Sequence, residues 1–277
     1  MSVWFVTGAS RGFGAEIVGQ ALAAGHQVVA TARDPRSVVA QFPEAGDQLL
    51  AVALDVTDER AASAAVSAAV ERFGRIDVVV NNAGRGLLSA VEEAGDAAVR
   101  GVYDANVFGV LNVLRAVLPV LRAQRSGHII NLSSIGGFRS SAGWGIYCST
   151  KFALEGISEA LADEVGPLGI SVTIVEPGYF RTDFLDASSL HTEDGVIEDY
   201  AATAGAVREH AAAANHNQPG DPVKAVAAIL ELASAAHPPL RVQLGTDAFA
   251  AVADKLNAVA AEQQAWHELS VSTDFDD

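Results

Sequence analysis

Short runs of branched apolar residues alternate with longer helical patterns over the first 180 residues, and this alternation restricts the fold more than any other feature. The runs are rich in Val and Ile, as strands buried on both faces should be. Strands are expected at residues 3–7, 27–31, 49–54, 77–81, 127–132 and 170–175, and helices at 14–24, 58–73, 97–124 and 147–165, with Thr57 as an N-cap. This order predicts an α/β fold, a doubly wound parallel sheet of about seven strands with helices on both faces.

The regular alternation stops after residue 175. Residues 184–220 show no strong period, and we expect a lid over the substrate there. Asp221 followed by Pro222 is a typical helix start and opens a helix to about residue 235. A final strand at 240–244 and an amphipathic helix at 247–269 follow, within a C-terminal helical extension over 247–277 that ends in acidic residues. Without a repeat or a linker, the chain is predicted to be a single Rossmann-fold domain over residues 1–277.

The composition argues against several classes of protein. A chain of 277 residues, 50% of them hydrophobic, can form one core without a second domain. The formal net charge of −16 disfavours nucleic acid and anionic lipid as partners. The single cysteine, Cys148, cannot form an internal disulfide, and we recognise neither a signal peptide nor an apolar run long enough to span a bilayer. We expect a cytoplasmic protein without a catalytic metal, since the seven histidines lack metal-binding spacing.

A glycine-rich loop follows the first predicted strand and precedes the first predicted helix. Gly8, Gly12 and Gly14 have the spacing Gly-x-x-x-Gly-x-Gly. Glycine lets backbone N–H groups approach a pyrophosphate closely, and the amino end of a helix adds positive potential. A glycine trio alone also occurs in tight turns. Its place between a strand and a helix at the start of the chain favours a dinucleotide site.

Two arginines indicate which dinucleotide is bound. Folds that bind NAD tend to place an acidic residue at the end of the second strand, where it accepts hydrogen bonds from the ribose 2′-OH. Here that place holds Ala32, followed by Arg33, and Arg11 lies in the glycine-rich loop itself. Two guanidinium groups would suit the 2′-phosphate of NADP(H). We therefore predict NADP(H) in preference to NAD(H). The alternative is that both arginines are solvated, with Asp34 partly neutralising Arg33.

Tyr147 and Lys151 stand four positions apart and project from one face of a predicted helix. A phenol has a pKa of ~10, and a nearby ammonium group lowers it, so Tyr147 could exchange a proton with a carbonyl or an alcohol. Ser134 could donate a hydrogen bond to the same oxygen, and Ser133 is the alternative serine. A Tyr-x-x-x-Lys match also arises by chance as a packed tyrosine beside a surface lysine. The upstream serine and the glycine-rich loop favour the catalytic interpretation.

Taken together, these motifs resemble the short-chain dehydrogenase/reductase family over residues 2–183, with the general layout continuing to about residue 245. Residues 7–14 look like its cofactor loop, and Asn-Asn-Ala-Gly at 81–84 looks like the motif that stabilises the sheet and lines the adenine ribose, with Asn81 structural. Residues 54–56 look like the segment that contacts adenine. Asn106 matches the helix asparagine that holds a proton-relay water. Residues 177 and 178, with Thr182, look like the segment that positions the nicotinamide carboxamide.

The resemblance implies two sets of site residues. The catalytic set is Asn106, Ser134, Tyr147 and Lys151. The cofactor-binding set is Gly8, Ser10, Arg11, Gly12, Phe13, Gly14, Arg33, Asp55, Val56, Asn82, Ala83, Gly84, Tyr147, Lys151, Pro177, Gly178 and Thr182.

The expected substrate wall is mostly apolar or aromatic, which favours a hydrophobic ketone or aldehyde, although some of these residues could belong to the core. The wall residues are Gly136, Gly137, Phe138, Trp144, Tyr179, Phe180, Phe184 and Leu185. Arg139 could bind an acidic group or stay solvated. The resemblance also implies a homodimer formed through the helices that hold Asn106 and Tyr147.

The predicted activity is the NADPH-dependent reduction of a small-molecule ketone or aldehyde to an alcohol by reversible hydride transfer. Two alternatives stay open at this stage. One is an NAD-dependent alcohol or hydroxysteroid dehydrogenase that runs towards oxidation. The other, from a different class, is a dinucleotide-sensing regulator without turnover.

Overall fold

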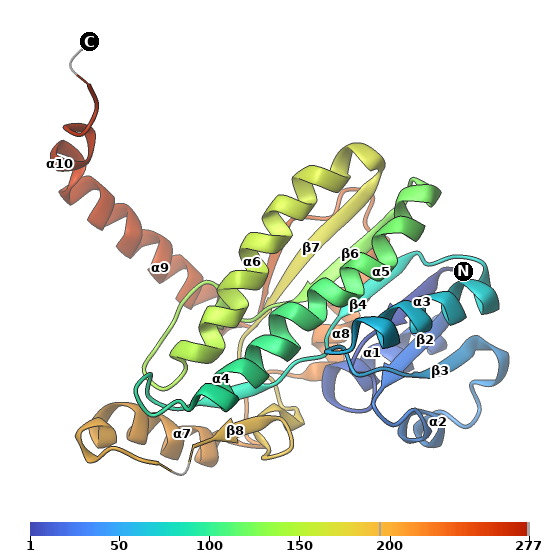
Figure 1. The fold of residues 1–277 in the computed structure, drawn as a ribbon, viewed down its shortest axis with the longest axis horizontal. Helices are drawn as coiled ribbons and strands as arrows, with labels where there is room; N and C mark the ends of the chain where they lie inside the picture. Colours follow the sequence, from blue (N-terminus) through green and yellow to red (C-terminus); the bar gives the residue numbers. More distant parts are fainter. Residues whose placement is uncertain (194, 276–277) are drawn as a thin grey trace.

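Seven parallel strands form the centre of the protein in the computed structural model, which describes residues 1–193 and 195–275 (Figure 1). Their order across the sheet is β3-β2-β1-β4-β6-β7-β9, and every pairing is parallel. The strands are β1 Val3–Val6, β2 Gln27–Ala32, β3 Leu49–Ala53, β4 Val78–Asn81, β6 Gly127–Leu132, β7 Ile170–Pro177 and β9 Arg241–Leu244. The order reverses between β1 and β4, so the predicted doubly wound parallel sheet is confirmed.

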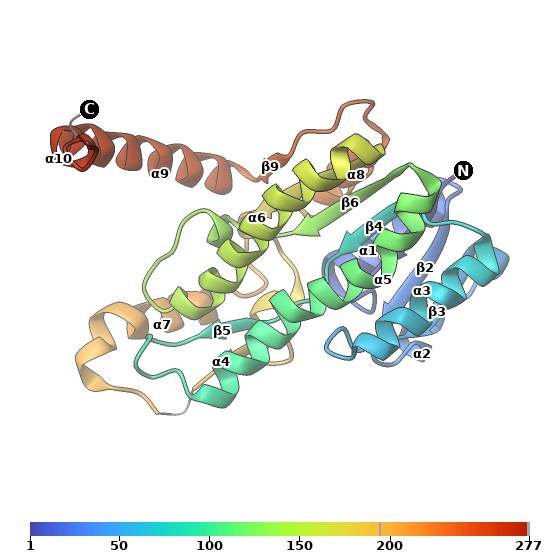
Figure 2. The same cartoon turned by 45° about the horizontal axis from the view of Figure 1, so that its top comes forward.

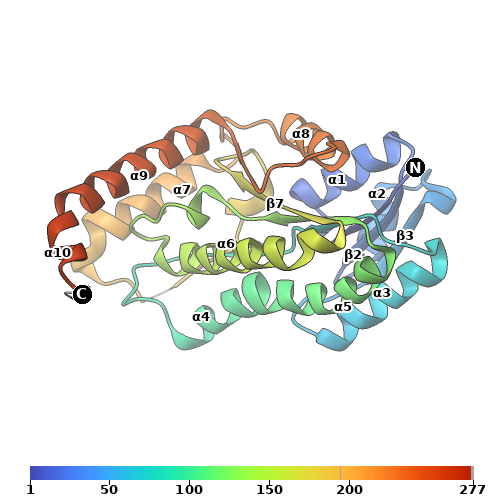
Figure 3. The same ribbon diagram turned by 90° about the horizontal axis from the view of Figure 1, so that it is seen from above.

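Helices cover both faces of this sheet (Figure 3). Because side chains alternate along a strand, Val3 and Phe5 pack on one face while Trp4 and Val6 pack on the other. The helices of the first face are α3 Glu59–Phe73, α5 Gly109–Gln124 and α6 Gly145–Val165, and those of the second are α1 Gly12–Ala23 and α8 Pro222–Ser234. A short helix, α2 Arg36–Gln41, follows β2.

Of the two N-caps predicted from the sequence, one is present in the structure and the other is replaced by a neighbouring residue. The Asp221 carboxylate accepts hydrogen bonds from the N–H groups of Val223 and Lys224, so this predicted cap of α8 is confirmed. The predicted cap at Thr57 is wrong, because Asp58 caps α3 instead. The Thr57 hydroxyl donates to the Asp55 carboxylate at 2.8 Å and is no longer available to the helix.

The third predicted helix is continuous but contains a π-helical turn. It consists of α4 Asp96–Tyr103, a π-helical segment Asp104–Phe108 and α5. By length and composition alone, Asp96–Gln124 passes a test for a membrane span, contrary to our expectation that no segment would do so. Half of its most apolar window is buried inside the protein, as in the core helix of a soluble protein. This segment is therefore weak support for a membrane location.

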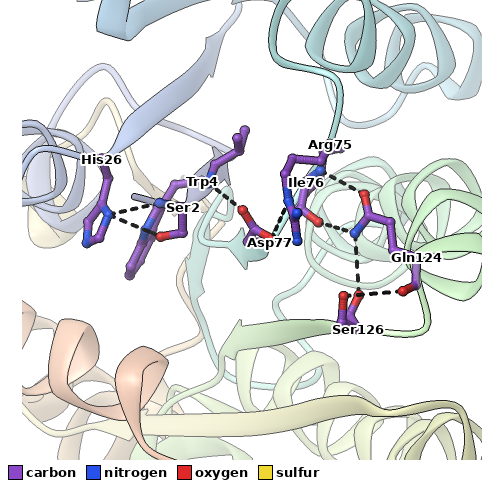
Figure 4. A network of polar contacts seen from close by, with 9 residues as sticks. Ser2, Trp4, His26, Arg75, Ile76, Asp77, Gln124 and Ser126 are labelled. Carbon is purple, nitrogen blue, oxygen red and sulfur yellow. Dashed lines mark hydrogen bonds and ion pairs between the residues drawn. The ribbon is translucent and has the colours of Figure 1, made fainter.

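The amino edge of the sheet is closed by polar contacts (Figure 4). The Gln124 side chain at the end of α5 accepts from the Ile76 N–H at 3.1 Å and donates to the Ile76 carbonyl at 2.6 Å. Asp77 accepts from the Val3 N–H at 2.8 Å and pairs with Arg75. These bonds satisfy backbone groups where strands begin, and they leave the carboxyl edge of the sheet to the site.

The segment between β7 and α8 covers the carboxyl edge of the sheet. It contains β8 Leu190–Thr192, which pairs in parallel with β5 Gly86–Leu88, and the helix α7 Ala206–Ala214. Glu93, only 1% exposed, fastens it by accepting from the Ile197 N–H at 2.9 Å and from Arg208 at 2.7 Å. These contacts lower the pKa of Glu93 to about 2, first through Arg208 and then through the Ile197 and Ala90 N–H groups. Residue 194 of the predicted lid lies outside the described residues.

The chain ends in two helices, α9 Thr246–Ala265 and α10 His267–Val271. Figures 1 and 2 show α9 leaving the body near the end of β9 and carrying α10 away from it. The predicted helix at 247–269 thus exists, with a break at Trp266. The last two residues of the expected acidic end, 276 and 277, lie outside the described residues.

Candidate active site

A cavity of about 800 Å³ opens at the carboxyl edge of the sheet. It lies where a doubly wound fold places its ligands, beside the reversal of strand order. Ser134, Tyr147 and Lys151 line this one cavity, together with every predicted cofactor residue except Gly14. Of the expected substrate wall, Gly136, Trp144, Tyr179, Phe180, Phe184 and Leu185 line it.

Four predicted residues do not line the cavity. Gly14 lies beneath the glycine-rich loop, and Asn106 lies behind the wall. Gly137 is buried against Ser133, and Phe138 is half-buried in the same turn. The expectation that Gly137 and Phe138 form the wall is wrong, because the turn that begins at Ser134 brings only its residues up to Gly136 to the cavity.

The glycine-rich loop is held to the neighbouring strand end by one asparagine. The Asn82 side-chain amide donates to the Thr7 carbonyl at 2.8 Å and to the Gly8 carbonyl at 3.1 Å. Gly8 and Gly12 have φ of 65° and 54°, in the left-handed region. A Cβ on Gly14 would stand 2.6 Å from Asn82 Nδ2 and would overlap the Gly8 carbonyl. Glycine at position 14 is therefore required for the close approach of loop and helix.

Basic residues are concentrated in this cavity although the protein is acidic. The chain has 34 acidic and 18 basic residues, but the cavity wall holds only Asp55 and Asp183 among the acids. Its basic members are Arg11, Arg33, Arg85, Arg139 and Lys151. A local positive region in a protein of net charge −16 favours an anionic ligand such as a dinucleotide.

The two arginines predicted to read the dinucleotide have different surroundings. Arg33 lines the cavity at the end of β2, and Asp34 does not neutralise it because Asp34 pairs with Arg36 at 2.9 Å. Arg11 is instead bonded to the lid, donating to the Ser188 hydroxyl, the Ser188 carbonyl and the Ser189 hydroxyl, each at 2.8 Å. Arg33 is thus the residue at the position where a ribose 2′ substituent is read.

Tyr147 lies in the floor of the cavity between aromatic rings. Its ring centroid is 5.6 Å from that of Trp144 and 5.5 Å from that of Phe184. Burial raises the pKa of Tyr147 above its ordinary value, and the adjacent Ser134 hydroxyl only partly opposes the shift. The expectation that Lys151 would lower this pKa is not met in this structure. The ammonium nitrogen lies 6.0 Å from the ring centroid.

Lys151 is turned towards the sheet. Its ammonium group donates to the Leu132 carbonyl at 2.7 Å, and only 7% of the residue is exposed. Burial lowers the pKa of Lys151 to about 8, with Glu155 acting in the opposite direction. A Cβ on Gly84 would lie 3.9 Å from the Lys151 nitrogen and 3.1 Å from the Asn106 side-chain oxygen, so the absence of a side chain at Gly84 leaves space between these two groups.

Asn106 belongs to the π-helical turn and is 1% exposed. Its amide donates to the Arg85 carbonyl at 2.9 Å and to the Thr150 hydroxyl at 3.0 Å, and its oxygen accepts from the Arg85 N–H at 2.9 Å. The side chain therefore holds the loop after β4 against α6. π-Helical turns inside α-helices occur frequently at functional sites because they displace backbone groups from the regular ladder.

The two adjacent serines face different neighbours. The Ser134 hydroxyl accepts from the Gly136 N–H at 3.0 Å and lies beside Tyr147. Ser133 faces Glu155 on the other side of the turn. Of the two, only Ser134 is placed to share a substrate oxygen with the phenol. Asn81 donates to Asn131 at 2.8 Å within the core, in agreement with its expected structural role.

The residues present fit a nicotinamide dinucleotide. The cavity volume is within the usual range for cofactor and ligand sites, ~300–1,000 Å³. The strand-to-helix turn at residues 8–14 has no side chains at its three glycines, and any Cβ at Gly8 or Gly14 would meet the loop after β4. At the end of the cavity away from Tyr147, the Asp55 carboxylate is held in place by accepting a hydrogen bond from the Thr57 N–H at 3.0 Å. Extended room, a glycine cradle and local positive charge together suit a long anion.

Sequence reasoning missed the structural role of Thr7 and several residues that line the cavity. Thr7 accepts from the N–H groups of Asn82 and Ala83, both at 3.0 Å, and so joins the two loops. The signal was its place directly before Gly8. Arg85, directly after residues 81–84, and Gln218, inside the expected lid, also line the cavity. Gln218 and Ser188 reach the cavity wall only because the lid folds back over the sheet, and no local sequence pattern indicates that path.

Comparisons with known proteins agree with the fold. The family model described as short chain dehydrogenase matches residues 2–193. The chain is 40% identical over 272 residues to "Oxidoreductase BOA17" of Botryotinia fuckeliana, covering 98% of each. It is 40% identical over 242 residues to "3-ketodihydrosphingosine reductase" of Bacteroides thetaiotaomicron, covering 87% of this chain and 86% of that one.

The solved structure of a short-chain dehydrogenase from Streptomyces avermitilis is similar along the whole length. It has a TM-score of 0.91 and 42% identity, and the match covers 99% of both chains. Two further solved structures share the fold at 22% and 23% identity, and one is described as holding bound NAD and the other bound NADP. The fold, the cavity and the extent of these matches show that the chain belongs to the short-chain dehydrogenase/reductase family of oxidoreductases.

Proposed function

We propose that the protein reduces a hydrophobic ketone or aldehyde to an alcohol with NADPH. The observation that carries this proposal is the phenol of Tyr147, buried beside Ser134 in a cavity that also holds Arg33, directly after the second strand, where folds that bind NAD place an acid. A protonated phenol is ready to donate a proton, which is the step that carbonyl reduction requires. The supply of a hydride is the chemistry that a reduced nicotinamide contributes when bound.

Four side chains of this protein are assigned separate roles in the reaction. Tyr147 donates its proton to the carbonyl oxygen as that oxygen gains charge. Ser134 donates a hydrogen bond to the same oxygen and holds it beside the phenol. Lys151 binds ribose hydroxyl groups through its ammonium group. Asn106 acts as a positioning residue that holds the Arg85 loop and α6 at the distance where a relay water fits.

The proposed cofactor preference rests on the second strand. Ala32 and Arg33 stand where folds that bind NAD place an acid, and Asp34 is already paired with Arg36. Arg33 would then bind the 2′-phosphate through charge-assisted hydrogen bonds. The remaining cofactor contacts are assigned to the loop residues and to Asp55, Asn82 and Thr182, which line the same cavity.

The proposed substrate class follows from the wall around Tyr147. Trp144, Tyr179, Phe184 and Leu185 line the cavity there and offer an apolar surface. By its name, the relative from Bacteroides thetaiotaomicron reduces a keto compound with a long hydrocarbon chain, which agrees with an apolar substrate here. The cytoplasmic location expected from the sequence stays a prediction.

The test is an absorbance assay of NADPH and NADH consumption against a panel of apolar ketones and aldehydes, run with the wild type and with Tyr147→Phe. We expect NADPH to be consumed with at least one member of the panel. The variant should lose roughly 10²–10⁴-fold in kcat, the usual contribution of a positioned proton donor. A preference for NADH would overturn the cofactor assignment. Turnover unchanged in Tyr147→Phe would overturn the mechanism.

A further inference from the structure

The C-terminal helix α9 stands away from the rest of the molecule (Figures 1 and 2). Its first turns pack on the body, where Ala248 is fully buried and Val252 is 7% exposed. From Leu256 to residue 275 every described residue is exposed. An isolated helix of this length is only marginally stable in water, so a projecting helix usually depends on packing against something. We call residues 246–271 the arm.

The arm exposes a large share of the apolar surface of the protein. Six of the fourteen large apolar side chains that are exposed in residues 1–193 and 195–275 lie in the arm, between positions 249 and 271. Among them, Phe249 is 68% exposed, Leu256 55%, Val259 45% and Trp266 63%. Monomeric proteins rarely leave so many apolar side chains together in water. The arm therefore has the character of an interface.

The spacing of these side chains indicates what kind of partner fits. Phe249, Val252, Leu256, Val259 and Trp266 follow intervals of three, four, three and seven residues. This is the heptad spacing of a helix that packs lengthwise against another helix. The stripe starts at the base of the arm, where Val252 packs against the body, and ends at Trp266, where α9 breaks, so a second helix laid along it would also approach the body.

We propose that the arm binds the arm of a second copy of this chain in an antiparallel pair. In that pairing, Phe249 of one copy packs against Trp266 of the other, and Leu256 packs against Val259. The large ring at the base of one arm is thereby covered by the large ring at the tip of the other. A two-fold axis passes through the middle of the pair, so both stripes are buried by one symmetric contact.

The residues that flank the stripe favour this direction. In antiparallel helices, side chains on the same flank meet their own kind, so Lys255 of one copy faces Glu262 of the other, and this occurs twice by symmetry. On the opposite flank Ala253 faces Ala260, and two small side chains let the backbones approach closely. A parallel pair would instead place Lys255 opposite Ala260, without an ionic partner. Lys255 is one of only three lysines in the chain.

The size of the contact is adequate for a dimer. With two aromatic side chains of ~150–250 Å² each, more than half exposed, together with Leu256, Val259 and Leu269, each arm offers about 500 Å² of apolar surface. Specific interfaces bury ~800 Å² on each partner, and the polar flanks supply the remainder. A membrane is the weaker partner, since the arm carries Asp254, Glu262 and Glu268 and the whole chain has a net charge of −16.

The first test measures molar mass by sedimentation equilibrium on the full chain. Leu256→Glu places a charge in the centre of the stripe, and Asn257→Glu adds the same charge one position away, on the outer face. We expect Leu256→Glu to have half the mass of the wild type at the same concentration, and Asn257→Glu to keep the wild-type mass. This holds whether the wild type is a dimer or, through a second contact at α5 and α6, a tetramer.

The second test examines the direction of the pair. Lys255→Glu and Glu262→Lys should each weaken association, and the double variant K255E/E262K should restore it, because the two ion pairs are reformed with reversed sign. Circular dichroism of each variant shows that α9 remains helical. The proposal is overturned if the wild type is monomeric, including a monomer that floats with anionic vesicles, if Leu256→Glu keeps the wild-type mass, or if the double variant fails to reassociate.

Discussion

The guanidinium of Arg11, in the glycine-rich loop, is hydrogen-bonded to the Ser188 hydroxyl at 2.8 Å, across 177 positions of sequence. Two further bonds at 2.8 Å join Arg11 to the Ser188 carbonyl and the Ser189 hydroxyl. Ser188 and Ser189 are the two residues before the strand β8, which pairs with β5 beside the cavity. Arg11, which was expected to bind the 2′-phosphate of the cofactor, thus holds the lid against the glycine-rich loop.

Arg11→Ala should loosen the lid more than it changes cofactor choice. Losing three hydrogen bonds from a partly exposed group is expected to cost about 1–3 kcal/mol of lid closure. We expect faster hydrogen exchange at residues 186–192 and a KM for the carbonyl substrate raised by roughly tenfold, with the ratio of NADPH to NADH efficiency changed by less than about threefold. If the variant lost its NADPH preference and kept lid protection, Arg11 would be a 2′-phosphate ligand instead.

Arg33→Ala should have the complementary effect. Hydrogen bonds to a charged group contribute about 1.5–3 kcal/mol, so the KM for NADPH should rise by roughly 10–100-fold. The KM for NADH should change little, since NADH has no 2′-phosphate. Arg100→Ala is the matched control, because that guanidinium is paired with Asp96 at 2.8 Å and does not line the cavity. Equal losses with both cofactors would show that Arg33 is not the discriminating residue.

Gly14→Ala should damage the cofactor loop. The added methyl group would overlap the Gly8 carbonyl and stand 2.6 Å from Asn82 Nδ2, and both are held by the contacts that shape the loop. Overpacking of this kind costs about 1–3 kcal/mol, and we expect dinucleotide affinity to fall by roughly 10–100-fold. Isothermal titration measures the affinity.

Gly156→Ala is the control for this substitution. Gly156 is an exposed residue within α6, and nothing lies within 4 Å of a Cβ placed on it. Alanine there should stabilise the protein by about 0.5–1 kcal/mol and leave cofactor binding intact. Unimpaired affinity in Gly14→Ala would show that the loop can move to accept a side chain.

The layout of the fold could be read from the sequence because it rests on local patterns. Buried parallel strands require branched apolar runs, and the turn at Gly8 and Gly14 requires residues without a Cβ, so both leave a trace along the chain. The strand at 127–132 was predicted to the residue. Tyr147, Lys151 and Ser134 were expected in one crevice, and the structure places all three in its wall.

Features that depend on the direction of a single side chain could not be read in this way. Thr57 and Asp58 are both good capping residues, and the choice fell to Asp58 because Thr57 bonds to Asp55. The predicted effect of Lys151 on Tyr147 assumed that a helix neighbour points at the ring. The ammonium group instead binds the Leu132 carbonyl of the adjacent strand, a tertiary contact with no sequence signal. The hydrogen bonds of Arg11 to Ser188 and Ser189 are likewise tertiary contacts with no sequence signal.

The anchoring of the lid through Glu93 should depend on pH and weaken in acid. Contacts with Arg208 and two backbone N–H groups hold the pKa of Glu93 at about 2, below its ordinary 4.5. A lowered carboxyl pKa contributes stability that is complete above the ordinary value and is lost as pH falls from 4.5 towards 2. Hydrogen exchange of residues 197–208 should therefore accelerate on acidification. In Glu93→Gln, exchange should be faster at neutral pH and nearly independent of pH in that range. Protection that is equal in both proteins would contradict the anchoring role.

The buried ammonium group of Lys151 should lower the free energy of unfolding at neutral pH. Burial lowers its pKa from 10.5 to about 8 in the folded protein, so between these values the unfolded chain binds more protons than the folded one. Stability then rises with pH through this window, by up to about 3 kcal/mol at 1.36 kcal/mol per pKa unit. Lys151→Met removes the buried charge and leaves the Leu132 carbonyl unpaired, which costs about 1–3 kcal/mol.

The variant should therefore lose the rise in stability above pH 8, as urea unfolding at pH 7, 8, 9 and 10 without cofactor would show. At pH 7 we expect it to be as stable as the wild type or more stable by up to about 2 kcal/mol, while turnover is lost. The KM of the wild type for NADPH should rise above pH 8, where the ammonium group proposed to hold the ribose loses its proton. A wild-type stability that is flat between pH 8 and 10 would mean that Lys151 stays charged in its buried position.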